Sequence, residues 1–180
     1  GCPAGPSADP EISPMVLDGR RTAERILERL KPLVARRDVP LQLAAVLVGD
    51  DTALKKFVDL KKRAAEAIGA QFSSYAFNGQ VSQQELVDDI AWLSADDMVH
   101  GIIVELPLPE RFDVQAVTGA IVLGKDIDVL SPAAQERYYA DKLPILPPSV
   151  QALKAVLDQE GINPRGKSVA VFGGGMLVGT

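Results

Sequence analysis

The stretch that most constrains the fold is residues 101–109, which read Gly-Ile-Ile-Val-Glu-Leu-Pro-Leu-Pro. A short run of β-branched apolar residues is typical of a strand in the interior of a parallel sheet. Pro107 and Pro109 mark where this strand ends, because proline has no amide hydrogen to donate to a neighbouring strand. Glu105 is the exception, since it places an acidic side chain at the carboxyl end of an apolar strand. Ligands of open α/β sheets bind beyond these ends, so Glu105 points either into solvent or into a binding site.

The remaining sequence alternates apolar runs with amphipathic segments. This alternation predicts an α/β fold in which helices flank a mainly parallel sheet. Further strands are expected at residues 41–48, 71–77 and 167–172. Helices are expected at residues 20–35, 53–68, 82–93, 113–121 and 149–159, whereas residues 131–143 are expected to be irregular. The helix at 82–93 begins with a capping box, because Ser82 is followed three residues later by Glu85.

Composition places the chain among globular proteins. Hydrophobic residues make up 47% and charged residues 24% of its 180 residues, which is enough apolar sequence for a real core. The formal charge of −5 argues against nucleic acid or an anionic membrane as a partner. No apolar run reaches the roughly 20 residues of a membrane helix, and the N-terminus shows no signal-peptide pattern. Together with a single cysteine, Cys2, these features predict a soluble cytoplasmic protein.

The helix expected at residues 53–68 carries the most informative lysine of the chain, Lys61. We expect the inward face of this helix to consist of Ala53, Phe57, Leu60, Ala64 and Ile68. Lys61 follows Phe57 by one helical turn, so it lies at the edge of this face. A lysine there either snorkels from the boundary into solvent or serves a site.

Two acidic residues, Asp126 and Asp128, stand two positions apart. An extended backbone would place both side chains on one face, but such a pair is most often part of a solvated turn. No cysteine or histidine stands nearby in the sequence, so we expect no metal site. His100, the only histidine, precedes the strand at 101–104 and is expected to have a structural role.

The glycines near the end of the sequence follow an expected strand. Gly173, Gly174, Gly175 and Gly179 come directly after residues 167–172. Glycines in this place let backbone amides approach the pyrophosphate of a dinucleotide at a helix N-terminus. The helix, the acidic residue and the later strands of a dinucleotide-binding domain do not follow, so we expect an incomplete cofactor site.

Several segments, in the same order and spacing, resemble one family of folate enzymes. Residues 101–109 resemble the signature Gly-Ile-(Leu/Ile)-Val-Gln-Leu-Pro-Leu-Pro of the bifunctional methylenetetrahydrofolate dehydrogenase/methenyltetrahydrofolate cyclohydrolase family. Matching segments also occur at residues 17–20, 47–51, 57–61, 125–128, 144–147 and 173–179. The resemblance therefore extends over about residues 16–180.

The resemblance implies a reaction and a domain organisation. The family oxidises 5,10-methylenetetrahydrofolate with NADP, sometimes NAD, and then hydrolyses the methenyl product to 10-formyltetrahydrofolate. Folate lies between a catalytic domain and a Rossmann domain. By resemblance, residues 15–147 form the folate-type catalytic domain, after a disordered tail at residues 1–14. Residues 148–180 then supply a linker helix and the first strand and glycine-rich turn of an incomplete dinucleotide-binding domain.

The resemblance also implies roles for individual residues. Lys61 aligns with the central catalytic lysine, and Glu105 with the glutamine that tunes it. Phe57 aligns with the tyrosine that stacks on the folate, and Asp128 with the aspartate that holds the pterin. Pro107 belongs to the loop beside the substrate.

The sequence departs from the family pattern mainly at polar site positions. Glu105 replaces glutamine, and a carboxylate beside Lys61 would favour the charged ammonium over the neutral amine that a general base requires. The ring of Phe57 lacks the hydroxyl of the family's tyrosine. Further departures are Leu54 for serine, Val129 for glycine, Ile145 and Leu146 for Cys-Thr, and Gly174 and Gly175 for Arg-Ser in the loop expected to bind NADP.

Three functional hypotheses fit these observations. The chain is an active folate dehydrogenase/cyclohydrolase, a divergent homologue that binds a folate-like ligand without the parent chemistry, or a structural or interaction module that keeps only the fold. We expect Lys61 and Glu105 to form an ion pair within about 4 Å. We also expect the chain alone to bind no NADP, and its exposed apolar surface to favour self-association into homo-oligomers.

Overall fold

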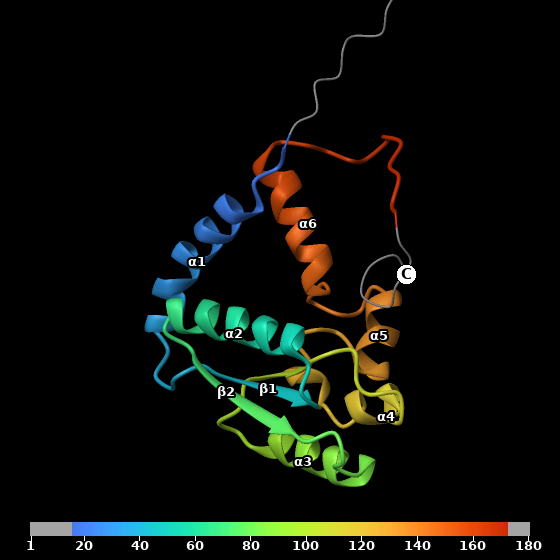
Figure 1. Cartoon of the computed structure of the whole chain (residues 1–180). Coiled ribbons are helices and arrows are strands. Elements are labelled where there is room, and N and C mark those ends of the chain that lie inside the picture. Colours follow the sequence, from blue (N-terminus) through green and yellow to red (C-terminus); the bar gives the residue numbers. More distant parts are fainter. Residues whose placement is uncertain (1–15, 173–180) are drawn as a thin grey trace, which may run out of the picture.

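A computed structural model describes residues 16–172 and shows an α/β fold (Figure 1). Three parallel strands form one sheet in the order β2-β1-β3, with helices on both faces. The strands are β1 (Gln42–Val48), β2 (Gln71–Phe77) and β3 (Gly101–Val104). The helices are α1 (Gly19–Ala35), α2 (Thr52–Ala67), α3 (Gln83–Ala95), α4 (Val114–Thr118), the 3₁₀ helix η1 (Leu123–Lys125), α5 (Pro132–Tyr139) and α6 (Pro148–Gln159). The predicted fold class is confirmed.

The pairing of the strands brings their carboxyl ends to one edge of the sheet. β1 pairs with β2 along its whole length, from Gln42↔Gln71 to Val48↔Phe77. β3 pairs with the other side of β1, with Val104 opposite Val46. All three strands are parallel, so the loops that follow them share the side of the sheet on which α4 and α5 lie (Figure 1).

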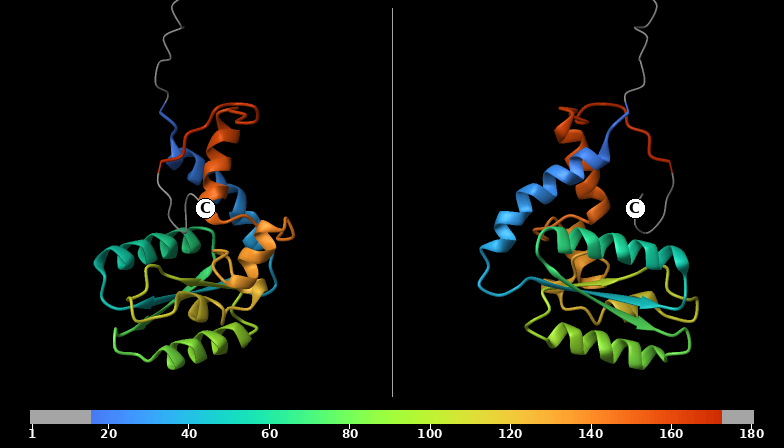
Figure 2. Two further views of the ribbon diagram at one scale, coloured as in Figure 1. Left: turned by 90° about the vertical axis from the view of Figure 1, so that its right-hand side faces the viewer. Right: turned by 60° about the vertical axis from the view of Figure 1, so that its left-hand side comes forward.

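Helices α2 and α3 cover opposite faces of the sheet (Figure 2). Side chains alternate between the two faces along each strand. Val46 and Ile102 therefore pack with the α3 residues Leu86, Ile90 and Leu93. Residues adjacent to these two along the strands face the other side, where Ala45 and Ile103 pack with Val58 of α2. β1 and β3 are buried on both faces, which explains why their sequences read as nearly continuous apolar runs. β2, at the edge of the sheet, is only partly covered and has a more polar sequence.

A second layer is formed by α1 and α6, which lie side by side on the α2 side of the molecule (Figures 1 and 2). The guanidinium of Arg21 lies 2.7 Å from the carboxylate of Glu160, so an ion pair joins the two helices. Pro32 lies inside α1 without ending it. Within residues 16–172 no helix is both long and apolar enough to cross a membrane.

The inward face predicted for α2 is wrong by one position along the helix. Phe57 and Leu60 were expected to be buried, yet they are 57% and 54% exposed, and Ala53 and Ala64 are exposed as well. The buried positions are Leu54, Val58 and Ala65. The helix thus carries two apolar stripes about 100° apart, one through Phe57 and one through Val58. Periodicity alone does not decide between them, and the sheet covers the stripe through Val58.

Two further expectations about secondary structure are also wrong. Residues 131–143 contain a helix, α5, which Ser131 caps by accepting a hydrogen bond from the amide of Ala134 at 3.2 Å. Residues 167–172 form no strand, and the side chains of Val169, Val171 and Phe172 are 68%, 67% and 95% exposed. No strand lies beside this segment in the described part of the chain, and an extended segment needs a hydrogen-bonding neighbour to become a strand.

Candidate active site

Glu105 is buried at the carboxyl end of β3, on the side of the sheet that α2 covers. Its amide donates to the carbonyl of Val46 at 2.9 Å, so its backbone continues the pairing with β1. Ile103 faces α2, and the pleat of the strand turns Glu105, two residues later, toward the same helix. Only 6% of the Glu105 side chain is exposed. Of the two orientations open to Glu105 from the sequence, the inward one is observed.

Lys61 reaches Glu105 from α2. It follows the buried Val58 by three residues, which places its side chain on the helix face that packs on the sheet. The Lys61 Nζ lies 2.8 Å from Glu105 Oε1 and 3.9 Å from Asp128 Oδ2. About a third of the Lys61 side chain, 36%, is exposed. The predicted ion pair between Lys61 and Glu105 is confirmed, and we call Lys61, Glu105 and Asp128 the charged cluster.

The environment of Asp128 within the charged cluster raises the pKa of its carboxyl group. Burial raises the pKa of its carboxyl group, because a low-polarity surrounding disfavours the charged form. The ammonium of Lys61 lowers this pKa, whereas the carboxylates of Glu105 and Asp126 raise it, and the balance is a raised pKa. One cation thus faces two carboxylates in the cluster, which gives it a formal charge of −1 when all three groups are ionised.

The expectation that Asp126 and Asp128 form a solvated turn is wrong. Asp126 is 2% exposed, and its carboxylate accepts hydrogen bonds from the amides of Leu130 at 3.1 Å and Ser131 at 2.7 Å. The backbone between these residues passes through Val129 at a φ of 59°, a left-handed conformation that glycine usually adopts. Sequence reasoning did not identify Asp126 as part of the site; the signal that could have pointed to a tight turn there is the family's glycine at the position of Val129.

The other residues assigned by resemblance lie at the surface or outside the described chain. The ring of Phe57, one helical turn before Lys61, is largely exposed and free to stack on a ligand. Pro107 is exposed in the loop after β3 and follows a cis peptide bond. The glycines of the expected NADP loop, Gly173, Gly174, Gly175 and Gly179, lie outside the described residues, as does Cys2.

The described residues contain no metal-binding cluster, and His100 lies between two strands. Among residues 16–172, no three His, Cys, Asp or Glu side chains are grouped so that they could hold a metal ion. The Nδ1 atom of His100 accepts a hydrogen bond from the amide of Gln42 at 3.2 Å, and its own amide donates to the carbonyl of Gln42 at 2.9 Å. These bonds tie the residue before β3 to the start of β1, so the structural role predicted for His100 is confirmed.

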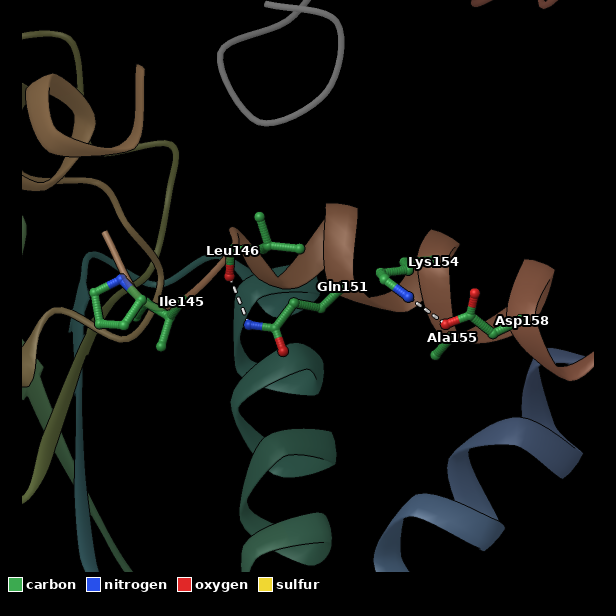
Figure 3. Close-up of a pocket in the computed structure, with 7 residues that line it drawn as sticks. Ile145, Leu146, Gln151, Lys154, Ala155 and Asp158 are labelled. Atoms are coloured by element: carbon green, nitrogen blue, oxygen red, sulfur yellow. Dashed lines mark hydrogen bonds and ion pairs between the residues drawn. The ribbon is translucent and has the colours of Figure 1, made fainter. Parts of the chain in front are cut away.

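A pocket of about 280 Å³ lies beside α6 (Figure 3). Its walls combine the apolar segment before α6 with polar side chains of the helix itself. Gln151 donates to the carbonyl of Leu146 at 2.6 Å, and Lys154 pairs with Asp158. The lining residues are Pro144, Ile145, Leu146, Gln151, Lys154, Ala155 and Asp158. No member of the charged cluster contributes to these walls.

Comparison with known proteins agrees with the geometry. Residues 17–128 match the family described as tetrahydrofolate dehydrogenase/cyclohydrolase, catalytic domain. The chain belongs to this family. The match ends at Asp128, so it includes all three members of the charged cluster.

Relatives and solved structures support the family membership. The bifunctional protein FolD of Moorella thermoacetica is 35% identical over 167 residues, which cover 91% of this chain and 60% of the relative. FolD of Lacticaseibacillus casei is 36% identical over 166 residues, covering 91% and 59%. A methylenetetrahydrofolate dehydrogenase-cyclohydrolase of Trypanosoma brucei, solved with NADP cofactor and an inhibitor, superposes with a TM-score of 0.85 at 29% identity, covering 92% of this chain and 58% of that chain. The chain thus spans about three fifths of the length of the curated relatives it matches.

Proposed function

We propose that this chain is the catalytic portion of a methylenetetrahydrofolate dehydrogenase/methenyltetrahydrofolate cyclohydrolase, and that Lys61 is its catalytic group. The observation that carries the proposal is the charged cluster, in which the Lys61 Nζ lies 2.8 Å from Glu105 Oε1 at the carboxyl end of β3. Parallel α/β sheets bind their ligands at this edge. The relatives that share this fold act on tetrahydrofolate derivatives, according to their names.

Of the two reactions of the family, the hydrolysis suits residues 16–172 best, because it needs no dinucleotide. In this reaction water adds to the methenyl carbon, the bond from this carbon to N5 breaks, and a proton is released as 10-formyltetrahydrofolate forms. The methenyl substrate carries a positive charge, and a cluster with a formal charge of −1 favours its approach. Lys61 would orient the attacking water, and Glu105 would hold the ammonium in place.

The ligand would be held by residues around the charged cluster. We propose that the exposed ring of Phe57 stacks on the aromatic part of the folate. Asp128 would accept hydrogen bonds from the pterin, and Pro107 would line the entrance to the site. NADP, when present, would supply the oxidation step as hydride acceptor; its binding is proposed to require more of a Rossmann domain than residues 148–180.

A second hypothesis rests on Glu105 itself. The short contact to Glu105 occupies the Lys61 Nζ in an ion pair, which opposes work as a general base. A homologue that binds folate without turnover would show this arrangement. The two hypotheses differ in what replacement of Glu105 by the family's glutamine does to the rate.

The test is the loss of absorbance of 5,10-methenyltetrahydrofolate in the presence of the protein. Lys61→Met alone would leave a buried carboxylate without a partner, which destabilises proteins by about 3–5 kcal/mol. The informative variants are therefore Glu105→Gln and the double variant Lys61→Met/Glu105→Gln, with Lys62→Met as the matched control on the exposed side of α2.

We expect the wild type to accelerate hydrolysis, Glu105→Gln to be faster, and Lys62→Met to match the wild type. The double variant should be slower than Glu105→Gln by about a hundredfold or more, the usual contribution of general acid–base catalysis. Equal rates for Glu105→Gln and the double variant would refute the role of Lys61. Binding of the methenyl compound with no acceleration by either the wild type or Glu105→Gln would establish the second hypothesis instead.

Self-association and a cytoplasmic location belong to the proposal as well. Exposed apolar side chains on α6 and after it support self-association, since Leu153 is 60% and Phe172 95% exposed. Light scattering during size-exclusion chromatography measures the mass directly, and a mass of 19.2 kDa at all concentrations would contradict self-association.

A further inference from the structure

Asp126 stands beside the charged cluster without belonging to it. Its side chain is almost fully buried, at 2% exposure. Oδ1 accepts a hydrogen bond from the amide of Leu130, and Oδ2 accepts one from the amide of Ser131. A buried carboxylate is costly unless it is fully hydrogen-bonded, and both oxygens of Asp126 have partners from a single stretch of backbone. We call this arrangement of Asp126, Leu130 and Ser131 the carboxylate clamp.

Both ends of the clamped segment are fixed to the rest of the fold. The backbone of Asp126 pairs with Ile102 of β3 in an isolated parallel bridge. Just before it, the Lys125 Nζ donates to the carbonyl of Asp96 at 2.6 Å. At the other end, Leu130 is buried, at 8% exposure, and its carbonyl oxygen lies 3.3 Å from Thr118 Oγ1, whose single proton is shared with the closer carbonyl of Val114 at 2.8 Å. The first end of the segment is thus held by hydrogen bonds and the second mainly by burial, and the clamp sets the shape between them.

That internal shape determines where Asp128 lies. The clamp brings Leu130 and Ser131 back over Asp126, so the chain must reverse within three residues. The chain reverses at Val129, which has a left-handed φ of 59° and a buried side chain, with 4% exposure. Asp128 lies inside the reversal, and its Oδ2 is 3.9 Å from the Lys61 Nζ.

We propose that Asp126 is a positioning residue, whose clamp on the amides of Leu130 and Ser131 holds Asp128 in the charged cluster and thereby sets the affinity for folate. The affinity part rests on the proposed function. Asp126 touches no substrate and acts only through Asp128. Its negative charge also contributes to the raised pKa of Asp128, so geometry and charge act on the same carboxylate.

The experiment is a double-mutant cycle on the affinity for tetrahydrofolate, measured by calorimetry with the full chain. Asp126→Asn keeps the size of the side chain and one acceptor oxygen. The substitution removes one charged hydrogen bond of the clamp. We expect the affinity for tetrahydrofolate to fall about tenfold, which is the size of effect that the loss of a hydrogen bond to a charged group produces. If Asp126 acts through Asp128, the variant Asp126→Asn/Asp128→Asn should bind no more weakly than Asp128→Asn alone. Losses that multiply in the double variant would overturn the proposal.

Ser82→Ala is the control for simple destabilisation. It breaks the capping box at the start of α3 and contacts neither the clamp nor the charged cluster. We expect it to lower the melting temperature while leaving the affinity for tetrahydrofolate unchanged. A loss of affinity in Ser82→Ala in proportion to its loss of stability would reduce Asp126 to a structural role.

A second readout needs no folate and separates the two proposals. Carbon-detected NMR follows the titration of the Asp128 carboxyl group. In Asp126→Asn the pKa of Asp128 should fall toward its usual range, because the neighbouring charge is gone and the released side chain becomes more exposed. If the wild type binds no tetrahydrofolate, the proposed function is refuted. The positioning of Asp128 by Asp126 is then still tested by this titration. An unchanged Asp128 titration in Asp126→Asn would refute it.

Discussion

Val129 allows a direct test of the backbone reversal beside the charged cluster. The residue combines a left-handed φ of 59° with a side chain that is 4% exposed, so two effects oppose each other at one position. A left-handed conformation costs a residue with a Cβ atom about 1–2 kcal/mol. Burial of a valine side chain contributes about 1.5–3 kcal/mol in the other direction. Val129→Gly should therefore cost only about 1 kcal/mol, although it empties a buried site.

The comparison with alanine isolates the backbone contribution. Val129→Ala loses nearly the same packing but keeps the cost of the left-handed conformation. Glycine has more conformational freedom than alanine in the unfolded chain, which lowers the stability of Val129→Gly by about 0.4–1 kcal/mol. Val129→Gly should thus be more stable than Val129→Ala by about 1 kcal/mol. Val58 is the matched control, because it is equally buried, at 5% exposure, but lies in the interior of α2. There alanine should be more stable than glycine by about 1 kcal/mol.

Urea unfolding followed by far-UV circular dichroism measures all four variants under the same conditions. With a slope of about 2 kcal/mol per molar urea, a difference of 1 kcal/mol moves the midpoint by about 0.5 M. The expected result is an inverted order of alanine and glycine between positions 129 and 58. If Val129→Ala is at least as stable as Val129→Gly, the left-handed conformation at this position does not cost about 1–2 kcal/mol. The backbone reversal that places Asp128 then needs another explanation.

Three further predictions concern other positions. Gly101→Ala should destabilise the protein by about 1–3 kcal/mol, because the new Cβ would lie 2.9 Å from side-chain carbons of Ile127 and Leu43, whereas Gly124→Ala, with nothing within 4 Å, should be neutral or stabilising in the same urea assay. Asp128→Asn should be at least as stable as the wild type at neutral pH. The raised pKa of Asp128 means that its stabilising contribution is complete below the usual value of 3.8 and is lost as the pH rises through the folded-state pKa, so the advantage of Asp128→Asn should grow with pH in melting curves and vanish at low pH. Ser82→Ala should cost about 1 kcal/mol, because it breaks the capping box with Glu85 at the start of α3, and unchanged stability would contradict that role.

The elements that follow from local chemistry are those that the sequence predicts well. The capping box of α3 is present as expected, because it depends only on residues close together in the chain, and β2 has the expected bounds beside β1. The ion pair between Lys61 and Glu105 was also predictable, but only through the family resemblance. Periodicity placed Lys61 at the edge of a face that turned out to be exposed.

The features that the sequence could not show depend on partners far away in the chain. The choice between the two apolar stripes of α2 is made by the sheet, which accepts Val58 and leaves Phe57 outside. The burial of Asp126 depends on β3, where its backbone pairs with Ile102. A strand at residues 167–172 needs a neighbour that local sequence does not provide.

The charged cluster also bears on the order in which the molecule assembles. Glu105 faces α2, so its carboxylate leaves water only when this helix docks on the sheet. The same helix carries its partner Lys61, 44 residues away in sequence. A helix docked there without the lysine would bury a charge with no counterion, at a cost of several kcal/mol. Docking of α2 is thus energetically coupled to the pairing of these two side chains. A chain whose sheet is covered by α2 has therefore also brought its lysine to the site.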